Sequence, residues 1–397
     1  MYTVIASREQ RVPIKAWLPP AEIEPAAMEQ LKNAANHPDV EPHVSVMPDC
    51  HVGHGVTIGC VLPTENTLLP TAVGVDIGCG MCAVPTGVKF HPKRMDAGYW
   101  KKWGNSVQRS VPTGFYAHQQ RQRWDGLEVS LCAQPLQLLL RDKAPFQLGT
   151  LGGGNHFLEA QVDENGQIWC MVHSGSRHTG LRIAAHYTDL AKALTELRGI
   201  NVPPGLWSLP LEEQVAQDYA HDMTWATDFA LESRYRMLEA MLEAFGLGVE
   251  DVGGRIAVIN IHHNFAQIEE HQGRLLVIHR KGATSARPGE MGIIPGSMGA
   301  PSYIVRGLGN EESFASCSHG AGRKMSRTQA KKTIGEDALK SALKGTFTAP
   351  SKGVLDEAPQ AYKDVTKVIA RQTDLIEVIH TLRPIMTIKG DSKARDD

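Results

Sequence analysis

Apolar and polar positions along the chain predict short strands and turns mixed with several long helices. Residues 26–36, AAMEQLKNAAN, have the spacing of an amphipathic helix. Short apolar runs broken by Gly, Pro and Asp, such as VSVMP and VTIGCVLP, are typical of strands that end in turns. The same reasoning predicts helices over residues 127–142, 181–197, 211–245 and 324–343, strands over FLEAQV, IWCMVH, RIAVINI and LLVIH, a Gly/Pro-rich loop over residues 281–300, and a closing helix–strand pair.

The order of these elements indicates an α+β fold. Strands and helices mix without regular βαβ alternation, so mixed sheets flanked by helices fit better than a doubly wound parallel sheet. The 397 residues would allow two or three domains, but no repeat, low-complexity tract or Pro/Ser-rich linker marks a boundary between them.

Composition narrows the class of protein. The chain is 42% apolar and 21% charged, as ordinary soluble globular proteins are. Its net charge of −2 gives no global basic field, so a polyanion would have to meet a local patch. No apolar run approaches the roughly twenty residues that span a bilayer, and MYTVIASREQ lacks the features of a signal peptide. Together with an odd number of cysteines, seven, this predicts reduced thiols, a cytoplasmic location and no membrane partner.

The run VGVDIGCGMC, residues 73–82, sets a carboxylate, Asp76, three positions before a thiol, Cys79. Glycines around them allow a tight turn that directs both side chains to one point. His156, His173 and His263 occur in equally Gly- or Asn-rich settings, all at predicted strand ends or loops. An Asp/Cys/His set from separate segments is typical of a buried divalent-metal site, and these ligand types are compatible with Mn²⁺, Zn²⁺ or Co²⁺.

Cys82 completes a C-x-x-C pair with Cys79, which is also found in zinc knuckles and redox sites. A structural zinc site usually needs a second such pair, and the chain has none. We therefore expect Asp76 and Cys79 to be ligands and Cys82 to be a packing residue. The spacing also suggests a disulfide between Cys79 and Cys82 when metal is absent, which would make the protein sensitive to oxidation.

A second kind of chemistry is indicated by CSHGAGR, where His319 precedes a glycine-rich turn that ends at Arg323. This pattern suggests a nucleophile beside a phosphate cradle. The segment PGSMGAPSY, residues 295–303, is either a nest for a nucleotide or a surface turn. Walker and G-x-S-x-G patterns are absent, which disfavours a P-loop NTPase or a serine hydrolase. The segment MPDCHVGHG adds Asp49, His51 and His54, for which a substrate-side or structural role fits better than metal binding.

Several strings together resemble the RtcB family of GTP-dependent RNA ligases, in particular its bacterial members, over nearly the full length. These strings are MPDCHVGHG, AVGVDIGCGM, GTLGGGNHF, HSGSR, HHN, KGATSAR, IIPGSMG, RGLGNEESFASCSHGAGR and TLRPIMTIKG. Two departures from the bacterial pattern are Cys82, in place of Asn, and His178-Thr179, in place of Gly-Ile. The resemblance implies a single RtcB-type catalytic domain over residues 1–397.

The resemblance also implies the cofactors, two Mn²⁺ ions and GTP, and the residues that hold them. One ion would be bound by Asp76, Cys79 and His156, and the other by Cys79, His173 and His263. The catalytic residue that becomes guanylylated would be His319. The guanylate contacts would be Asn155, His156, Phe157, Leu158, Glu159, His263, Asn264, Pro295, Gly296, Ser297, Met298, Ser302, His319, Gly320, Ala321, Gly322 and Lys389.

The activity implied is the joining of RNA ends that carry a 2′,3′-cyclic phosphate or 3′-phosphate to 5′-hydroxyl ends, in RNA repair or tRNA splicing. The sequence leaves open whether an activating protein partner takes part. One alternative is a dinuclear metallo-phosphodiesterase that acts on cyclic-phosphate RNA ends without guanylylation. Another is a ribosome- or RNA-binding module with a structural metal. Neither alternative has a use for a nucleophile at His319.

Overall fold

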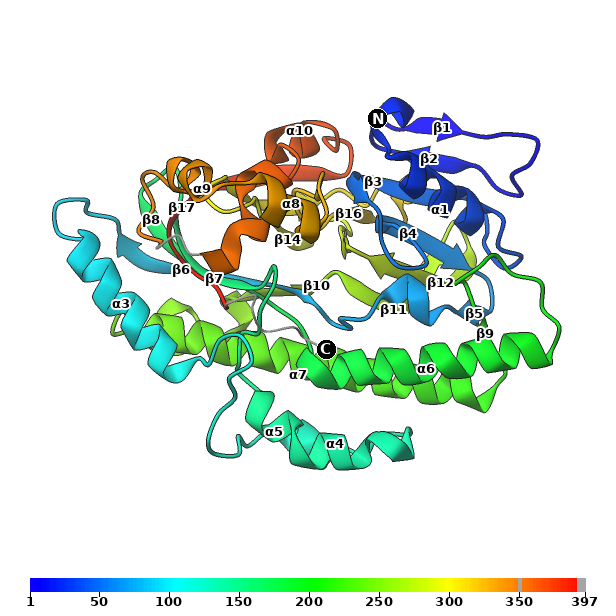
Figure 1. Ribbon diagram of the computed structural model, residues 1–397, viewed down its shortest axis with the longest axis horizontal. Helices are drawn as coiled ribbons and strands as arrows, with labels where there is room; N and C mark the ends of the chain where they lie inside the picture. The colour runs from blue at the N-terminus through cyan, green and yellow to red at the C-terminus, as the bar shows by residue number, and fades with distance from the viewer. Residues whose placement is uncertain (349–351, 391–397) are drawn as a thin grey trace.

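The computed structural model describes residues 1–348 and 352–390, and most of its strands form two large sheets (Figure 1). The six-stranded sheet pairs antiparallel neighbours except for one parallel pair, β2 with β3. Helix α1 (Pro25–Ala35) packs against this sheet through the buried side chains of Leu31 and Ala34. In spatial order the strands are β1 (Thr3–Ile5), β2 (Ile14–Ala16), β3 (Val44–His51), β4 (Ile58–Thr64), β12 (Arg274–Lys281) and β11 (Asn264–His271).

The seven-stranded sheet is antiparallel and apolar on both faces. Along β6, Cys82 and Val84 belong to one hydrophobic cluster while Met81 and Ala83 belong to another. This division follows from the two-residue period of a strand, which sends successive side chains to opposite faces. In spatial order the strands are β10 (Ile259–His262), β6 (Gly80–Lys89), β8 (Gln167–Ser174), β7 (Phe157–Val162), β17 (Ile376–Ile388), β15 (Ser302–Gly307) and β14 (Met291–Ile294).

Two long helices, α6 (Arg177–Leu197) and α7 (Gln214–Glu243), pack against each other along one side of the molecule (Figure 1). Helix α7 contacts β6 and β8, and α3 (Ala97–Ser110) covers the same face with Trp100 and Trp103. The shorter elements are α2 (Pro70–Val73), α4 (Gln137–Asp142), α5 (Ala144–Gln147), α8 (Arg327–Thr333), α9 (Glu336–Ala342), α10 (Val365–Ala370), and the two-stranded pairs β13 (Ala283–Ser285) with β16 (Ser316–Ser318) and β5 (Thr67–Leu68) with β9 (Leu209–Pro210).

The α+β prediction is confirmed, as mixed sheets with helices on their faces. Of the two long predicted helices, α6 begins four residues early and α7 lies within its predicted range. Within the two described ranges, no helix has both the length and the apolar character that a membrane span requires.

Three local predictions were wrong. Only the last third of residues 127–142 is α-helical, since a 3₁₀ turn containing Pro135 precedes it. The predicted helix over residues 324–343 is divided at Gly335, which caps α9. The predicted loop over residues 281–300 contains β13 and β14, whose partners β16 and β15 lie further along the chain and leave no mark on the local pattern.

Candidate metal centre and adjoining pocket

A tight turn between α2 and β6 places Asp76 and Cys79 just before the first residue of β6, an inner strand of the seven-stranded sheet. The amide of Cys79 donates to the carbonyl of Asp76 at 3.1 Å, and Gly78 adopts a positive φ of 72° that suits glycine. The following Gly80 lies so close to β10 that an added Cβ would stand 1.9 Å from the carbonyl oxygen of Ile261. The glycines that flank the thiol therefore allow the turn and its close contact with the next strand.

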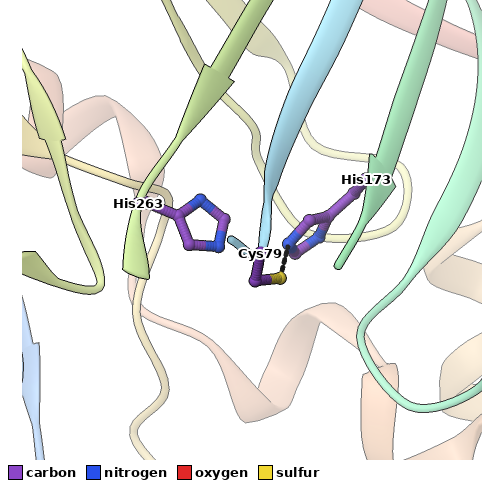
Figure 2. A group of neighbouring side chains, drawn as sticks. All are labelled: Cys79, His173 and His263. Atoms are coloured by element: carbon purple, nitrogen blue, oxygen red, sulfur yellow. Dashed lines mark hydrogen bonds between the residues drawn. The ribbon is translucent and has the colours of Figure 1, made fainter. Parts of the chain in front are cut away.

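Cys79, His173 and His263 converge from three different elements (Figure 2). All three side chains are buried, and each offers a ligand atom within 4.8 Å of the others. His173 stands at the end of β8, with its Nε2 3.4 Å from Cys79 Sγ. His263 lies between β10 and β11, and its amide donates to the carbonyl of Cys79 at 2.8 Å. Its Nδ1 is buried without a hydrogen-bond partner among the described residues.

Asp76, Cys79 and His156 form a second group with the same maximum spacing of 4.8 Å. His156 Nε2 lies 3.1 Å from Asp76 Oδ2 and 3.5 Å from Cys79 Sγ. Its other ring nitrogen, Nδ1, lies 3.0 Å from the carbonyl of Leu151, which fixes the ring so that Nε2 faces the group. Cys79 thus belongs to both groups, and all five predicted ligands meet in one place.

Burial and neighbouring charges set the protonation of this centre. Burial lowers the pKa of His173 and of His263 well below the usual value, so both imidazoles are neutral and have a lone pair to donate. Burial opposes ionisation of Asp76, but the hydrogen bond and charge of His156, the hydrogen bond with Cys79 and the charge of Arg177 together outweigh it and leave the pKa of Asp76 lowered. Burial and the Asp76 charge raise the pKa of the Cys79 thiol well above normal, and a cation at the sulfur would reverse that effect.

A third Cys/His/Asp group, Cys132 with His221 and Asp222, lies apart from this centre. Its buried carboxylate already accepts from the amides of Cys132 and Ala133 and from the hydroxyl of Tyr187. Because these donors occupy both oxygens of Asp222, the group holds the loop before α4 onto α7, and we assign it a structural role.

His319 follows β16 and lies beside Asp49 at the end of β3. Its Nδ1 is 2.7 Å from Asp49 Oδ2, and the same oxygen accepts from the amides of His319 at 3.2 Å and Gly320 at 3.3 Å. Its ring packs edge-on against His263 with 4.9 Å between centroids. Rings of His263 and His173 are 5.2 Å apart, and those of His173 and His156 are 5.3 Å apart. A row of four histidines therefore leads from His319 into the metal-ligand group.

His319 also lines a cavity of about 590 Å³ whose wall comes from both large sheets and from the segment after β16. Most of the residues predicted to contact the nucleotide line this cavity. They are Asn155, Phe157, Glu159, Pro295, Gly296, Ser297, Met298, His319, Gly320, Ala321, Gly322 and Lys389. The segment at residues 295–298 is thus part of the cavity wall. A volume of this size suits a small organic ligand.

Two carboxylates in the cavity wall differ in their protonation. Burial raises the pKa of Glu159 to about 7, although Thr387 and Gln161 donate to it. Glu357 is also buried, but the charge of Lys389 at 3.3 Å and that of Arg327 lower its pKa to about 2. Lys389 is thereby fixed over the cavity by an ionised partner.

Other predicted contacts lie outside the cavity wall. The side chain of Leu158 is buried in the hydrophobic cluster under α3, so only its backbone is near the cavity. Asn264 donates to the carbonyl of Asp76 at 3.0 Å and supports the metal-ligand turn. Ser302 accepts from the amide of Gly296 at 3.2 Å and holds the segment at residues 295–298 in place. His156 and His263 belong to the metal-ligand groups.

The sequence does not indicate the partners of two residues that the structure brings to the site. For Asp49 it predicts a substrate-side or structural role, but nothing local indicates that the partner is His319, 270 positions away. Glu357 lies in KGVLDEAPQAY, which has no pattern that points to a binding site. Both are buried carboxylates whose role depends on contacts made by the fold.

Comparisons with known proteins identify relatives of this chain. The family model described as tRNA-splicing ligase RtcB matches residues 30–142 and 133–390. The RNA-splicing ligase RtcB of Escherichia coli K12 is 40% identical over 96% of this chain and 98% of that protein. The tRNA-splicing ligase RtcB of Archaeoglobus fulgidus is 31% identical over 93% of this chain and 92% of that protein.

Proposed function

This chain belongs to the RtcB family, and from that membership we propose that it joins RNA ends with GTP through a GMP group carried on His319. It is an RNA ligase, as its relatives are named. Its substrates are RNA ends with a 3′-phosphate or 2′,3′-cyclic phosphate on one side and a 5′-hydroxyl on the other. We place the ligase in the cytoplasm and assign the catalytic domain to residues 1–397, of which 349–351 and 391–397 lie outside the described residues.

The observation that carries this proposal is the position of His319 between the cavity and the metal-ligand group. Its ring lines the cavity and packs against His263. With Nδ1 beside Asp49, the Nε2 nitrogen is left to face a nucleotide. A carboxylate on one side of an imidazole, with a reacting group on the other, is a recurring arrangement for an activated nitrogen.

The donor set fits two divalent cations. Asp76, Cys79 and His156 would hold one, and Cys79, His173 and His263 the other, with Cys79 a member of both donor groups. The buried Nδ1 of His263, which has no hydrogen-bond partner within residues 1–348 and 352–390, and the neutral state of His173 support this assignment. We propose Mn²⁺ in both positions, where the ions would stabilise the negative charge that develops on the reacting phosphate oxygens.

Membership of the RtcB family implies the following sequence of bond changes. His319 Nε2 attacks the α-phosphorus of GTP, a P–N bond forms, and the bond to the β-phosphate oxygen breaks, which releases pyrophosphate. Water opens a 2′,3′-cyclic phosphate to a 3′-phosphate. An oxygen of the 3′-phosphate takes the GMP group from His319. The 5′-hydroxyl of the second RNA then attacks the 3′-phosphate, which forms the phosphodiester and releases GMP.

The cavity supports guanine as the base. A carboxylate accepts two hydrogen bonds side by side, which matches the N1–H and N2–H₂ donors of guanine and no equivalent edge of adenine. Glu159 is such a carboxylate in the cavity wall; each of its oxygens accepts one hydrogen bond, from Thr387 or Gln161, and has a second lone pair for the base. Lys389 lines the same cavity, and its Nζ lies 5.8 Å from the centroid of the Phe157 ring.

The test is ligation of a 2′,3′-cyclic-phosphate RNA to a 5′-hydroxyl RNA with Mn²⁺ and either GTP or ATP. We expect joined product with GTP, none with ATP, and none with His319→Ala. The metallo-phosphodiesterase alternative predicts opened cyclic phosphate with no joined product, the same with and without GTP. That result would overturn the proposal.

A further inference from the structure

The loop between α3 and α4 carries two adjacent aromatic side chains that are exposed to solvent. Phe115 is 56% exposed and Tyr116 is 79% exposed. Among residues 1–348 and 352–390, every other Phe, Tyr and Trp side chain is buried or partly buried. Single exposed apolar residues are common on protein surfaces, but a neighbouring pair in a chain that shields its other aromatic rings indicates a contact surface.

This aromatic pair is attached to the metal centre through backbone and side-chain contacts. The amide of Gly114 donates to the carbonyl of Gly152 at 2.8 Å, and the amide of Leu151 donates to the carbonyl of Pro112 at 2.9 Å. The carbonyl of Gly114 accepts from Arg177 Nη2 at 3.3 Å. The positive charge of Arg177 in turn acts on the metal-ligand carboxylate of Asp76.

Leu151, whose amide binds Pro112 in this loop, also contacts one of the candidate metal ligands through its carbonyl. Its carbonyl oxygen lies 3.0 Å from His156 Nδ1 and accepts from Ser174 Oγ, also at 3.0 Å. The loop that carries Phe115 and Tyr116 is therefore fixed to the same strand ends as the metal ligands. Gly114, the residue before the two exposed rings, is thus hydrogen-bonded to the segment that carries His156.

One stretch of the loop, next to the aromatic pair, is basic. Residues 113–124, TGFYAHQQRQRW, contain no acidic residue and include two exposed arginines, Arg121 and Arg123, whereas the acidic residues of the loop, Asp125 and Glu128, follow in the 3₁₀ turn Asp125–Glu128. Within the described parts of the chain, neither guanidinium forms an ion pair with a carboxylate. The guanidinium of Arg121 donates to the backbone carbonyl of Arg141. At Arg123 it is the backbone carbonyl that is engaged, since it accepts from the guanidinium of Arg236. A chain of net charge −2 thus presents a local basic and aromatic segment beside its candidate active site.

We propose that Phe115 and Tyr116 form a stacking platform for the unpaired bases next to the RNA end that is being joined. Flat aromatic faces hold bases of any sequence, and nearby arginines attract the phosphate backbone, which is how proteins bind single-stranded RNA without reading its sequence. The platform orients the RNA end towards the metal centre. This inference rests on the proposed function, since it assigns the surface to the RNA substrate of that site.

The test measures binding of single-stranded RNA with 2-aminopurine near its end, since the fluorescence of that base falls when it stacks. One oligonucleotide ends in a 3′-phosphate and another in a 5′-hydroxyl, which shows which end the platform holds. For the double variants Phe115→Ala/Tyr116→Ala and Phe115→Leu/Tyr116→Leu, we expect the dissociation constant for one of these ends to rise about tenfold or more, with loss of quenching. Leucine keeps apolar bulk without an aromatic face, so it separates stacking from simple apolar contact.

Two controls should bind both oligonucleotides as the parent protein does. Phe115→Tyr/Tyr116→Phe keeps both rings, and Ile256→Ala removes an apolar side chain that is 97% exposed elsewhere on the surface. Labelling of His319 by GTP without RNA should be unchanged in every variant, which also shows that each is folded. Parent-like binding by the alanine and leucine variants, or weaker binding with quenching retained, would overturn the inference. If the parent took no GMP group, the proposed function would fail, while the binding measurements would still decide the role of the platform.

Discussion

Cys79 has a special position among the candidate ligands because it belongs to both groups. Replacing it should therefore release more metal than replacing a ligand that belongs to one group. We predict that Cys79→Ala loses nearly all bound metal, while Asp76→Ala and His173→Ala each lose about half, as measured by elemental analysis after dialysis. The matched control is Cys82→Ala, which removes a neighbouring buried thiol and should retain the metal. Equal losses in the three ligand variants would contradict a shared thiolate.

The structure argues against the disulfide between Cys79 and Cys82 that the spacing suggests. The side chain of Cys82 is fully buried in the cluster under α3, whereas Cys79 contacts His173 across the opposite face of the sheet. Two thiols that point to opposite faces of a sheet cannot reach the geometry of a disulfide without movement of the backbone. The role of Cys82 as a packing residue thus agrees with its surroundings.

We therefore predict that mild peroxide treatment of the metal-free protein forms no bond between Cys79 and Cys82. Mass spectrometry of peptides from the treated protein, digested without reductant, measures this directly. Any reversible loss of activity should be the same in the parent protein and in Cys82→Ala. A peptide that contains the linked pair would contradict the orientation of these two side chains.

At the scale of elements, the turn after β16 depends on the close packing of Gly322 against the backbone of Asp49 in β3. Gly322 has a positive φ of 74°, and an added Cβ would stand 2.1 Å from the carbonyl oxygen of Asp49. Gly322→Ala should therefore push the turn away from β3 and separate His319 from Asp49, at a cost of more than about 1 kcal/mol in stability.

For Gly322→Ala we predict at least a tenfold lower rate of GMP transfer to His319, with metal content unchanged. Gly335→Ala is the control, because an added Cβ there meets nothing within 4 Å. The rate follows from labelling by radioactive GTP over time. A parent-like rate in Gly322→Ala would show that the contact between the turn and β3 does not position the nucleophile.

Strands β11 and β12 are joined by a buried ion pair. Glu269 accepts from both Arg280 Nη1 at 2.5 Å and Nη2 at 3.1 Å. Burial opposes ionisation of Glu269, but His271 and Arg280 overcome it and lower its pKa from the ordinary 4.5 to about 2. Because the folded-state pKa is the lower one, the pair's stabilisation is fully present above pH 4.5 and is lost as the pH falls towards 2.

Glu269→Gln should lower the free energy of unfolding at pH 7 by about 3–5 kcal/mol, since it leaves the Arg280 charge buried without its partner. Between pH 4.5 and 2 the stability of the parent should fall more steeply than that of the variant. Urea unfolding at several pH values measures both effects. Parallel pH profiles would mean that Glu269 does not contribute the predicted acid sensitivity.

At the scale of the whole molecule, local patterns predicted the long helices and most central strands, because amphipathic spacing and short apolar runs are local properties. The five residues of the two candidate metal-ligand groups were also identifiable, since glycines and asparagines around Asp76 and His156 mark turns that present side chains. The pairings that build the site were not predictable in this way. Asp49 meets His319 only because β3 and β16 are brought together by the fold. Glu357 likewise acquires its role from Lys389, which follows β17.

The central claim is that His319 carries a GMP group during RNA joining. The most direct measurement is the intact mass of the protein after incubation with Mn²⁺ and GTP in the absence of RNA. The account predicts one added guanylyl group, which acid removes and base preserves as a P–N bond requires, and none on His319→Ala, which should still bind metal. An unchanged parent mass, or a guanylyl group that persists in His319→Ala, would contradict it.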